Sequence, residues 1–504
     1  MDFQLPQYDL VKMLPEIVLF LWALLVMTTD VLGKRKSPEF IGYMTMLGLI
    51  ISGVLLATVG YGTGFGNMFI NDTMAVFFKV IFLGAAFMAV GSAFGITREK
   101  IQHHRGEFYG LLLFSTVGMM FLASSSELLS LYIGLELTTI PLFVLAAFFK
   151  DDQKSAESGA KYLIIGAFSS AILLYGLSFL YGLTGSTDIS VIRMALTEQH
   201  FASAEGVGLV MILAIVAIVA GIGFKLALPP FHQWAPDVYE GAPTPVTAFL
   251  SVGSKAAGLV AFAKIMVIGL FSFYEPIMSP SDWGILVAVL AGAAMIFGNS
   301  VAIRQTNIKR MLAYSSIAHA GYVMIGMLSI NELGLSAVGF YMFAYMFTNM
   351  GAFAVVALVE DKTGSCEIAD YDGLARSSPF LAGTMTVFLL SLTGIPPLAG
   401  FFGKYFVFAA AIKAAGSSVE LTWMYVLVGV GLITSVFALY YYAGVMKVMY
   451  FGKAEAPPRI PFNAPALVVL AIGLLGVLVF GLYPEPIVTF ASDIPRNYAF
   501  LLLP

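Results

Sequence analysis

The sequence contains fourteen apolar runs, each long enough to cross a lipid bilayer as a helix. A spanning helix needs about 20 predominantly apolar residues. The runs fall near 10–32, 40–62, 74–95, 107–124, 127–149, 158–182, 209–240, 244–271, 283–303, 311–329, 333–360, 380–413, 421–449 and 464–484. In hydrocarbon every backbone polar group must find its hydrogen bond within the protein, and a helix achieves this within one segment. The sequence therefore predicts an all-α integral membrane protein of about fourteen transmembrane helices.

The composition agrees with a chain that uses the bilayer as part of its solvent. Of its 504 residues, 59% are hydrophobic and 11% are charged, against about 25% charged residues in a typical soluble domain. No long polar segment separates the runs, so we expect a single membrane domain over 1–504. The first run contains Pro15 and Glu16 and reads as a helix rather than a cleaved signal. The net charge of −4 offers no basic surface to nucleic acid.

Residues suited to metals or redox groups are scarce. Cys366 is the single cysteine, so a disulfide framework and an iron–sulfur cluster are both excluded. Of the five histidines, His103 and His104 alone lie close together in sequence. No glycine-rich dinucleotide fingerprint and no phosphate-binding loop occurs. We therefore expect this chain to bind no metal, redox cofactor or nucleotide.

Lysine and arginine in the loops indicate the orientation. If both termini lie on the outer side, the loops that face inward hold sixteen Lys and Arg residues and the outward segments hold four. Cytoplasmic loops carry such an excess. The bias also supports the number of helices, because one missed helix would scramble the alternation. We expect a bacterial cytoplasmic (inner) membrane protein with both termini on the periplasmic side.

Two runs are longer than one span, and each contains a double proline. Pro229 and Pro230 interrupt helix 7, and Pro396 and Pro397 interrupt helix 12. A proline inside a helix removes one hydrogen bond and clashes with the carbonyl four residues earlier. The carbonyls expected to be freed are those of Lys225, Leu226, Leu392 and Thr393. Such backbone is tolerated at membrane depth only inside protein or along a wet cavity, and paired breaks point to a transport site.

The two breaks lie five helices apart, which predicts an internal repeat. Five is an odd number of spans, so the second copy must be inverted. The expected division is helices 1–3 at 1–100, a first repeat of helices 4–8 at 107–271, a second repeat of helices 9–13 at 283–449, and helix 14 with the C-terminal tail at 464–504.

Four charged side chains lie well inside the apolar runs: Glu136, Lys225, Lys255 and Lys404. A charge at the centre of a spanning helix costs about 2.5–3.5 kcal/mol, so four unpaired charges would cost on the order of 10 kcal/mol. Such residues usually face the bundle interior and mark ion pathways. Each can hold or release a proton, so a row of them suits proton transfer. A structural ion pair is the alternative for each.

Other ionisable residues in the runs have weaker signals. Lys161 starts near the inner end of helix 6, where a lysine ordinarily extends toward the interface. Lys79 and Lys264 lie toward the outer ends of their helices, and we expect both to reach the interface in the same way. His319 in helix 10 and His232 after the helix 7 break are either buried core histidines or members of a proton relay.

Three stretches resemble subunit N of bacterial respiratory complex I. They are FKLALPPFHQWAPDVYEGAPTPVTAFLSVGSKAA at 224–257, RMLAYSSIAHAGY at 310–322 and SLTGIPPLAGFFGKYFVF at 391–408. The fourteen-helix plan extends the resemblance over nearly the whole chain. Lys404 in helix 12 and the short tail after helix 14 favour subunit N over its sister subunits M and L.

The resemblance implies a role for each membrane charge. By motif position Glu136, Lys161, Lys225, Lys255 and Lys404 match the family's relay residues. In such a subunit, pairing of the helix 5 glutamate with the helix 7 lysine is thought to drive protons along the row. The chain would then be a proton-translocating, antiporter-like subunit of NADH:quinone oxidoreductase, a translocase in which it performs no redox catalysis alone.

The same resemblance implies a hetero-oligomeric setting in lipid. The expected partners are other membrane subunits, of the M type and the small J and K types. NAD, FMN, iron–sulfur clusters and quinone would be bound by other subunits. The plastid and cyanobacterial counterpart of this family shares the motifs. Two other functions stay open from the residues: a free-standing cation/proton antiporter of the Mrp kind, and a structural membrane scaffold.

Overall fold

The computed structural model describes residues 9–32, 39–95, 101, 104–197, 207–270, 280–329, 331–454, 457 and 459–496. The N-terminal half consists, in order, of η1 (Leu10–Met13), α1 (Leu14–Leu32), α2 (Phe40–Val59), β1 (Gly62–Gly64), β2 (Phe69–Asn71), α3 (Thr73–Ser92), α5 (Arg105–Ser124), α6 (Leu128–Ala146), α7 (Gln153–Thr184), α8 (Ile189–Thr197), α9 (Val207–Leu226), α10 (Trp234–Gly241), α11 (Thr244–Phe249), η3 (Leu250–Ser254), α12 (Lys255–Phe262) and η4 (Ala263–Gly269).

The C-terminal half is entirely helical in its described elements. They are α13 (Pro280–Ala302), α14 (Ile308–Leu328), α15 (Glu332–Thr363), η5 (Ile368–Tyr371), α16 (Leu374–Ser377), α17 (Pro379–Thr393), α18 (Ala399–Ser417), η6 (Val419–Leu421), α19 (Trp423–Phe451), α20 (Ala464–Leu482) and α21 (Glu485–Arg496).

The predicted transmembrane helices are present. Thirteen helices of the described chain are long and apolar enough to cross a membrane. The remaining predicted span, near 380–413, is divided into α17 and α18. The other long run, near 209–240, is divided into α9 and α10. The all-α membrane fold with breaks in helices 7 and 12 is therefore confirmed.

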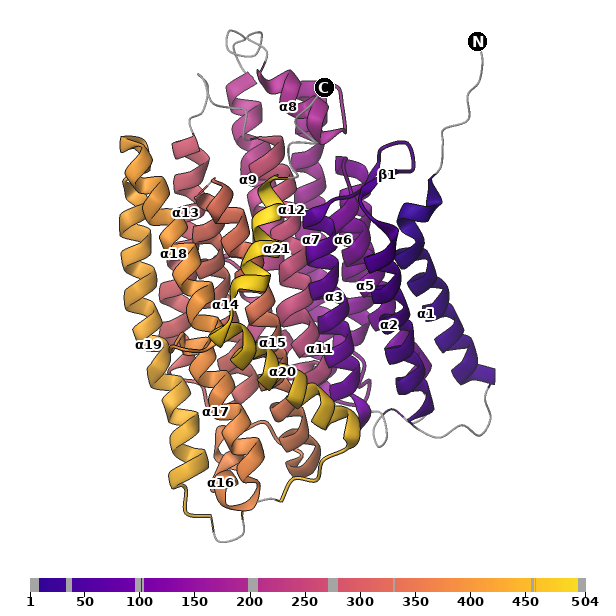
Figure 1. Cartoon of the computed structure of the whole chain (residues 1–504), viewed down its shortest axis with the longest axis vertical. Helices are drawn as coiled ribbons and strands as arrows, with labels where there is room; N and C mark the ends of the chain where they lie inside the picture. Colours follow the sequence, from indigo (N-terminus) through magenta and orange to yellow (C-terminus); the bar gives the residue numbers. More distant parts are fainter. Residues whose placement is uncertain are drawn as a thin grey trace.

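The helices run between two ends of the bundle. Figure 1 places β1 and α8 at one end and α16 at the opposite end, as the predicted alternation of loops requires. We call these the β1 end and the α16 end. The basic loop residues at 33–38 and 96–100, on which part of the predicted orientation depends, lie outside the described residues.

Side-chain caps fix where many of the helices begin. An acidic or amide side chain accepts a hydrogen bond from a backbone N–H of the first turn, which otherwise has no partner. The residues that do so are Asp72 before α3, Glu127 before α6, Asp152 before α7, Asn307 before α14, Asn331 before α15 and Asn463 before α20.

Helix 8 lies at the centre of the bundle. It comprises α11, η3, α12 and η4, and every residue from Thr244 to Leu270 is buried. Two of its segments are π-helical, a rare geometry that occurs frequently at functional sites. The neighbouring helices α14 and α15 are also buried along nearly their whole length. A helix that is buried all round provides the protein interior in which membrane charges are tolerated.

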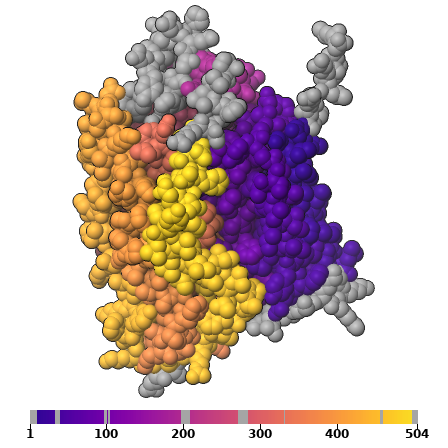
Figure 2. All heavy atoms as spheres, viewed as in Figure 1, coloured from indigo at the N-terminus to yellow at the C-terminus, as the bar shows by residue number. Residues whose placement is uncertain are grey.

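The C-terminal helices join the two halves. Figure 2 shows the C-terminal segment on the surface of the molecule, between the N-terminal part and the second half. The helices α20 and α21 both pack against α3 and α15.

A short antiparallel hairpin was not predicted. β1 pairs with β2 from Gly62↔Asn71 to Gly64↔Phe69. Its turn contains Phe65, Gly66 and Asn67, all with positive φ. The hairpin falls in the loop between helices 2 and 3, outside the apolar runs that predict the helices.

Glycine allows α5 and α6 to pack backbone to backbone. A Cβ at Gly118 of α5 would lie 2.4 Å from the Thr138 backbone nitrogen of α6. Real Cβ atoms essentially never approach that closely, and a backbone atom cannot swing away as the end of a side chain can. Small residues permit this kind of close helix contact in membranes.

We predict that Gly118→Ala forces α5 and α6 apart and lowers the stability of the protein by about 1–3 kcal/mol. The measurement is the thermal unfolding midpoint of the protein in detergent. Gly53→Ala in α2 is the matched control, because nothing lies within 4 Å of a Cβ built there. Equal midpoints for the two variants would contradict the prediction.

Candidate functional site

Lys225 lies directly before the break in helix 7. The helix α9 ends at Leu226, and the backbone turns at Ala227, which has φ +55°. The Lys225 side chain is 5% exposed, and its ammonium donates a hydrogen bond to the Thr139 hydroxyl of α6. The break therefore positions a buried cation against α6.

Glu136 lies one helical turn before Thr139 on the same helix. Its carboxylate accepts a hydrogen bond from the Ser170 hydroxyl of α7. Among the ion pairs of the described chain, none joins Glu136 to Lys225 within 4.0 Å. The direct pairing that the family resemblance implied is therefore absent from this structure, because Lys225 contacts Thr139 instead.

Lys404 occupies the break in helix 12. The helix α17 ends at Thr393, and Gly394 follows with φ +91°. The Lys404 ammonium donates to the Thr393 carbonyl at 2.8 Å and to the Ser435 hydroxyl at 2.8 Å. It also lies 4.8 Å from the centre of the Tyr322 ring, within range of a cation–π contact. Lys404 is 5% exposed.

Of the four carbonyls predicted to be freed, that of Thr393 is confirmed by its side-chain partners. Thr393 was predicted, and its carbonyl accepts hydrogen bonds from both Lys404 and Ser435. In helix 7 the carbonyl of Phe224, which was not predicted, accepts from the Trp234 indole at 2.9 Å. The reason is the turn at Ala227, which ends α9 before the prolines are reached.

Lys255 is the first residue after the π-helical segment η3. Its ammonium donates to the Ser316 carbonyl of α14 at 2.6 Å, and the side chain is 4% exposed. A narrow cavity beside it is lined by Leu226, Lys255, Ser316, His319 and Tyr341, among others. This cavity connects the neighbourhood of helix 7 with α14.

His319 lies one turn after Ser316. Its Nδ1 atom is 2.6 Å from the Tyr341 hydroxyl of α15. His319 and Tyr341 also line a second narrow cavity, together with Ser391, Leu392 and Gly403 from the helix 12 region. His319 therefore borders both cavities.

One face of α14 thus connects two of the predicted lysines. Ser316, His319 and Tyr322 are spaced three residues apart, so each lies on the same side of the helix as the next. Lys255 contacts the first, and Lys404 lies over the ring of the last. Six residues of helix span about 9 Å. Protons can cross that distance through side chains that are hydrogen-bonded or linked by water.

His232 does not belong to the row formed by Lys225, Lys255, His319 and Lys404. Its ring packs against Phe297 of α13 with ring centres 4.6 Å apart. Its Nδ1 atom is buried and has no hydrogen-bond partner within the described part of the chain.

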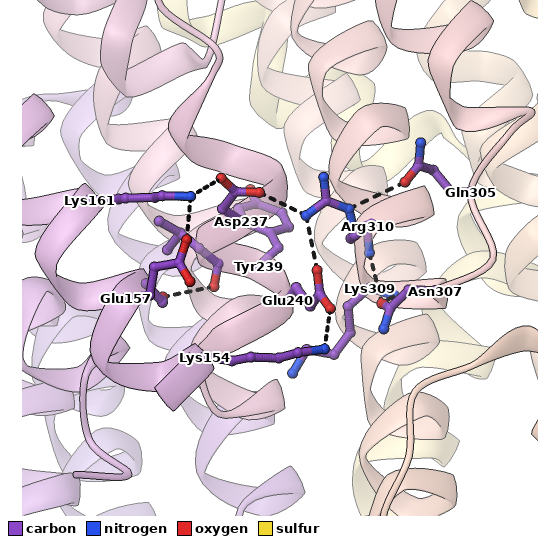
Figure 3. A network of polar contacts seen from close by, with 12 residues as sticks. Lys154, Glu157, Lys161, Asp237, Tyr239, Glu240, Gln305, Asn307, Lys309 and Arg310 are labelled. Atoms are coloured by element: carbon purple, nitrogen blue, oxygen red, sulfur yellow. Dashed lines mark hydrogen bonds and ion pairs between the residues drawn. The ribbon is translucent and has the colours of Figure 1, made fainter. Parts of the chain in front are cut away.

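Lys161 belongs to a separate network at the α16 end. Its ammonium is 2.5 Å from Asp237 of α10 and 2.6 Å from Glu157 of its own helix. The other oxygen of Asp237 binds Arg310 of α14 at 2.7 Å. Arg310 also forms an ion pair with Glu240, which in turn pairs with Lys154 (Figure 3). We call Lys161, Asp237, Arg310, Glu240 and Lys154 the charged clamp.

The clamp joins α7, α10 and α14. Lys161 is 39% exposed, in contrast to the buried lysines of the row. The clamp therefore holds the half-helix that follows the break in helix 7.

Two lysines were assigned wrongly from the sequence. Lys79 and Lys264 were expected to extend toward the interface, but they are 0% and 3% exposed. Lys79 forms an ion pair with Glu16 at 2.6 Å, and Lys264 donates to the Ser125 carbonyl at 2.5 Å. Position along a span does not reveal whether a side chain points to lipid or into the protein.

Sequence reasoning missed the uncharged members of the site and most of the clamp. Thr139, Ser170, Ser316, Tyr322 and Tyr341 carry no signal that separates them from other polar residues in helices. Asp237, by contrast, follows the helix 7 break closely and could have been paired with Lys161. Within the described ranges, no group of three His, Cys, Asp or Glu residues could hold a metal ion.

Comparison with known proteins identifies the family. Residues 125–438 match the family described as NADH:quinone oxidoreductase/Mrp antiporter, TM. NADH-quinone oxidoreductase subunit N of Heliobacterium modesticaldum is 42% identical over 463 residues, which cover 91% of this chain and 93% of that protein. The chain belongs to the NADH-quinone oxidoreductase subunit N family. The resemblance carried by the helix 7–8, helix 10 and helix 12 motifs is thereby confirmed.

Solved structures of this family and its relatives share the fold. A chain of respiratory complex I from Thermus thermophilus with bound aureothin has 31% identity and a TM-score of 0.76, covering 95% of this chain and 99% of that chain. A chain of the Mrp complex from Dietzia sp. shares the fold alone, with 17% identity and a TM-score of 0.78 over 98% of this chain and 100% of that chain.

We predict that Asp237→Ala lowers the stability of the protein by about 1 kcal/mol, because one residue then ceases to bridge α7 and α14. Glu157→Ala is the matched control. Its carboxylate binds the same lysine but is 56% exposed and joins no second helix, so we expect a change within about 0.5 kcal/mol. Thermal unfolding of the two variants measures the difference. A larger loss in Glu157→Ala would show that the bridge through Asp237 is not what stabilises the clamp.

Proposed function

We propose that the chain is the proton-translocating, antiporter-like subunit N of an NADH-quinone oxidoreductase. Quinone reduction elsewhere in the complex would drive protons along Glu136, Lys225, Lys255, His319 and Lys404. The observation that carries the proposal is the face of α14 that meets Lys255 at Ser316 and Lys404 at Tyr322. The name of the relatives supports the setting in which this row would operate.

The chemistry of the row follows from burial without fixed counter-ions. A buried ammonium group is costly unless it is paired, so a lysine in such a place exchanges its proton readily with a neighbour. Lys225, Lys255 and Lys404 all donate to uncharged oxygens. An uncharged acceptor leaves each lysine free to exist with or without its extra proton, whereas a carboxylate partner would hold the charge in place.

Lys161 and His232, the two remaining candidates, have different places in the proposed function. Lys161 would link the row to the aqueous phase at the α16 end, because it is partly exposed and is bound to the half-helix that follows Lys225. His232 is left outside the relay, since its contact is with Phe297 and not with a member of the row.

We further propose that helices 4–8 and helices 9–13 are two inverted copies of one unit. The helices α7 and α15 are both 32 residues long, and each ends at a glycine with φ near +70°. Isolated β-bridges precede α6 and α14 in the same way, Glu127↔Asp188 and Asn307↔Glu367. These matches support a repeat, and inversion follows from its five helices.

The partners and the location are part of the same proposal. Chains of similar fold occur in multi-subunit membrane complexes. We infer that this chain assembles with subunits of the M, J and K types in the bacterial cytoplasmic membrane. The termini would be periplasmic and the redox cofactors would lie on other subunits. An antiporter of the Mrp kind is the second candidate, supported by the fold alone.

Two substitutions test the relay. In membranes that carry Lys225→Ala or Glu136→Ala, we expect quinone reduction and proton pumping to fall together while the complex still assembles. The reason is that each substitution interrupts a tightly coupled proton path. Both rates are measured side by side in the same vesicles, with assembly checked on native gels.

Lys413→Ala provides the control for loss of a lysine charge, because Lys413 is exposed on α18 and lies outside the row. It is expected to leave both rates unchanged. Wild-type pumping and quinone reduction in Lys225→Ala and Glu136→Ala would reject the relay. A scaffold or an unrelated antiporter would then describe the chain better.

A further inference from the structure

A second set of buried charges lies at the β1 end, outside the row of the proposed relay. Glu16 of α1 and Lys79 of α3 are both 0% exposed, and Lys79 Nζ lies 2.6 Å from Glu16 Oε1. Lys79 also donates to the Asn71 side-chain oxygen of β2 at 2.9 Å. An ion pair is thus buried between two of the first three helices, which the proposed repeats do not include.

Lys264 of helix 8 reaches the same place from the other side. Its ammonium donates to the Ser125 carbonyl at 2.5 Å, and Ser125 forms a β-bridge with Phe69. Lys79 lies 4.7 Å from the centre of the Phe69 ring. The two ammonium groups therefore contact the two residues of the Phe69–Ser125 bridge, and the charge of Lys264 interacts with those of Lys79 and Asp72.

Polar atoms without partners lie beside these charges. The Ser124 hydroxyl is buried and has no hydrogen-bond partner in the described part of the chain, and the same holds for Glu16 Oε2. Buried polar groups are nearly always hydrogen-bonded, so such atoms call for an explanation. A carboxylate oxygen without a hydrogen-bond donor is well suited to accept a proton.

Stability does not explain why the pair is there. Replacing a buried ion pair by well-packed apolar residues is often neutral or stabilising, because desolvation offsets the attraction between the charges. Proton transfer explains the burial better, because it requires titratable side chains that can gain and lose protons inside the protein.

The set has a lysine neighbour on each side, one toward the proposed relay and one toward the surface. Lys255 and Lys264 lie on the same helix, nine residues or about 13 Å apart. Toward the surface, Lys12 precedes Glu16 by one turn, about 6 Å. Lys12 donates to the Tyr61 carbonyl in an exposed contact at the β1 end.

We propose that Glu16, Lys79 and Lys264 form a second proton-transfer site, which links Lys255 to the aqueous phase at the β1 end. The inference rests on the proposed function, because Lys255 must exchange protons with Lys264. In the central step an N–H bond of Lys79 breaks and an O–H bond forms on Glu16, so the ion pair becomes a neutral amine and a carboxylic acid. Lys264 then gives a proton to the Lys79 amine and is reprotonated from Lys255, and Glu16 releases its proton to water at the β1 end.

The test uses the complete complex in membrane vesicles. In the double variant Glu16→Gln/Lys79→Met, both charges are removed together, so no unpaired charge is left buried and assembly is expected to persist. We expect proton pumping and coupled quinone reduction to be lost. Lys264→Met is the second variant, since it leaves the ion pair intact, and the same loss is expected.

Ser52→Ala is the matched control. The Ser52 hydroxyl is buried and donates to the Pro15 carbonyl at 3.0 Å, next to Glu16, but it is not part of the proposed site. It should pump as the wild type does. Wild-type pumping in Lys264→Met, or in an assembled double variant, would overturn this site. Measuring Lys225→Ala in parallel distinguishes this second site from the proposed relay. If Lys225→Ala loses pumping while Lys264→Met and the double variant pump normally, only the second site is rejected. If all three variants pump normally, the relay itself is rejected.

Discussion

The structure depends on how the chain finds hydrogen-bond partners for its backbone groups and its charged side chains in a medium without water. Both problems meet at the break in helix 12. Pro397 cannot accommodate the carbonyl four residues earlier, so Thr393 loses its helical partner. That carbonyl then accepts from Lys404, which also donates to the Ser435 hydroxyl. One local defect therefore supplies the acceptor that lets a lysine be buried.

The break in helix 7 reaches the same result by another route. Its Phe224 carbonyl accepts from the Ala227 backbone N–H in the turn and from the Trp234 indole, which joins α10 to α9. The Lys225 ammonium donates to another helix, to the Thr139 hydroxyl of α6. The first lysine is consequently coupled to α6 and to the Glu136 side chain one turn away, whereas Lys404 is coupled to its own broken helix. The two halves of the relay respond to different neighbours.

The sequence was sufficient for the fold because its signals are local: length and polarity define the spans, and double prolines mark the breaks. The same signals identified Glu136, Lys225, Lys255 and Lys404 as membrane charges. They could not identify partners, since Thr139, Ser316 and Tyr341 are brought to the site by helix packing alone. For the same reason Lys79 and Lys264 were misassigned. The depth of a residue in the membrane can be read from its sequence position, but the side of the helix it faces depends on neighbouring helices.

The charged clamp and the buried row are mechanically linked through α14. Arg310, at the first turn of this helix, is held by Asp237 and Glu240 of α10. Ser316, His319 and Tyr322 follow on the same rigid helix and meet Lys255 and Lys404. The half-helix α10 begins just after the break that positions Lys225. A displacement of α10 would therefore change the surroundings of Lys225 through the break, and it would shift the α14 face through Arg310. In the proposed relay, the half-helix α10 thus links Lys225 to the part of α14 that meets Lys255 and Lys404.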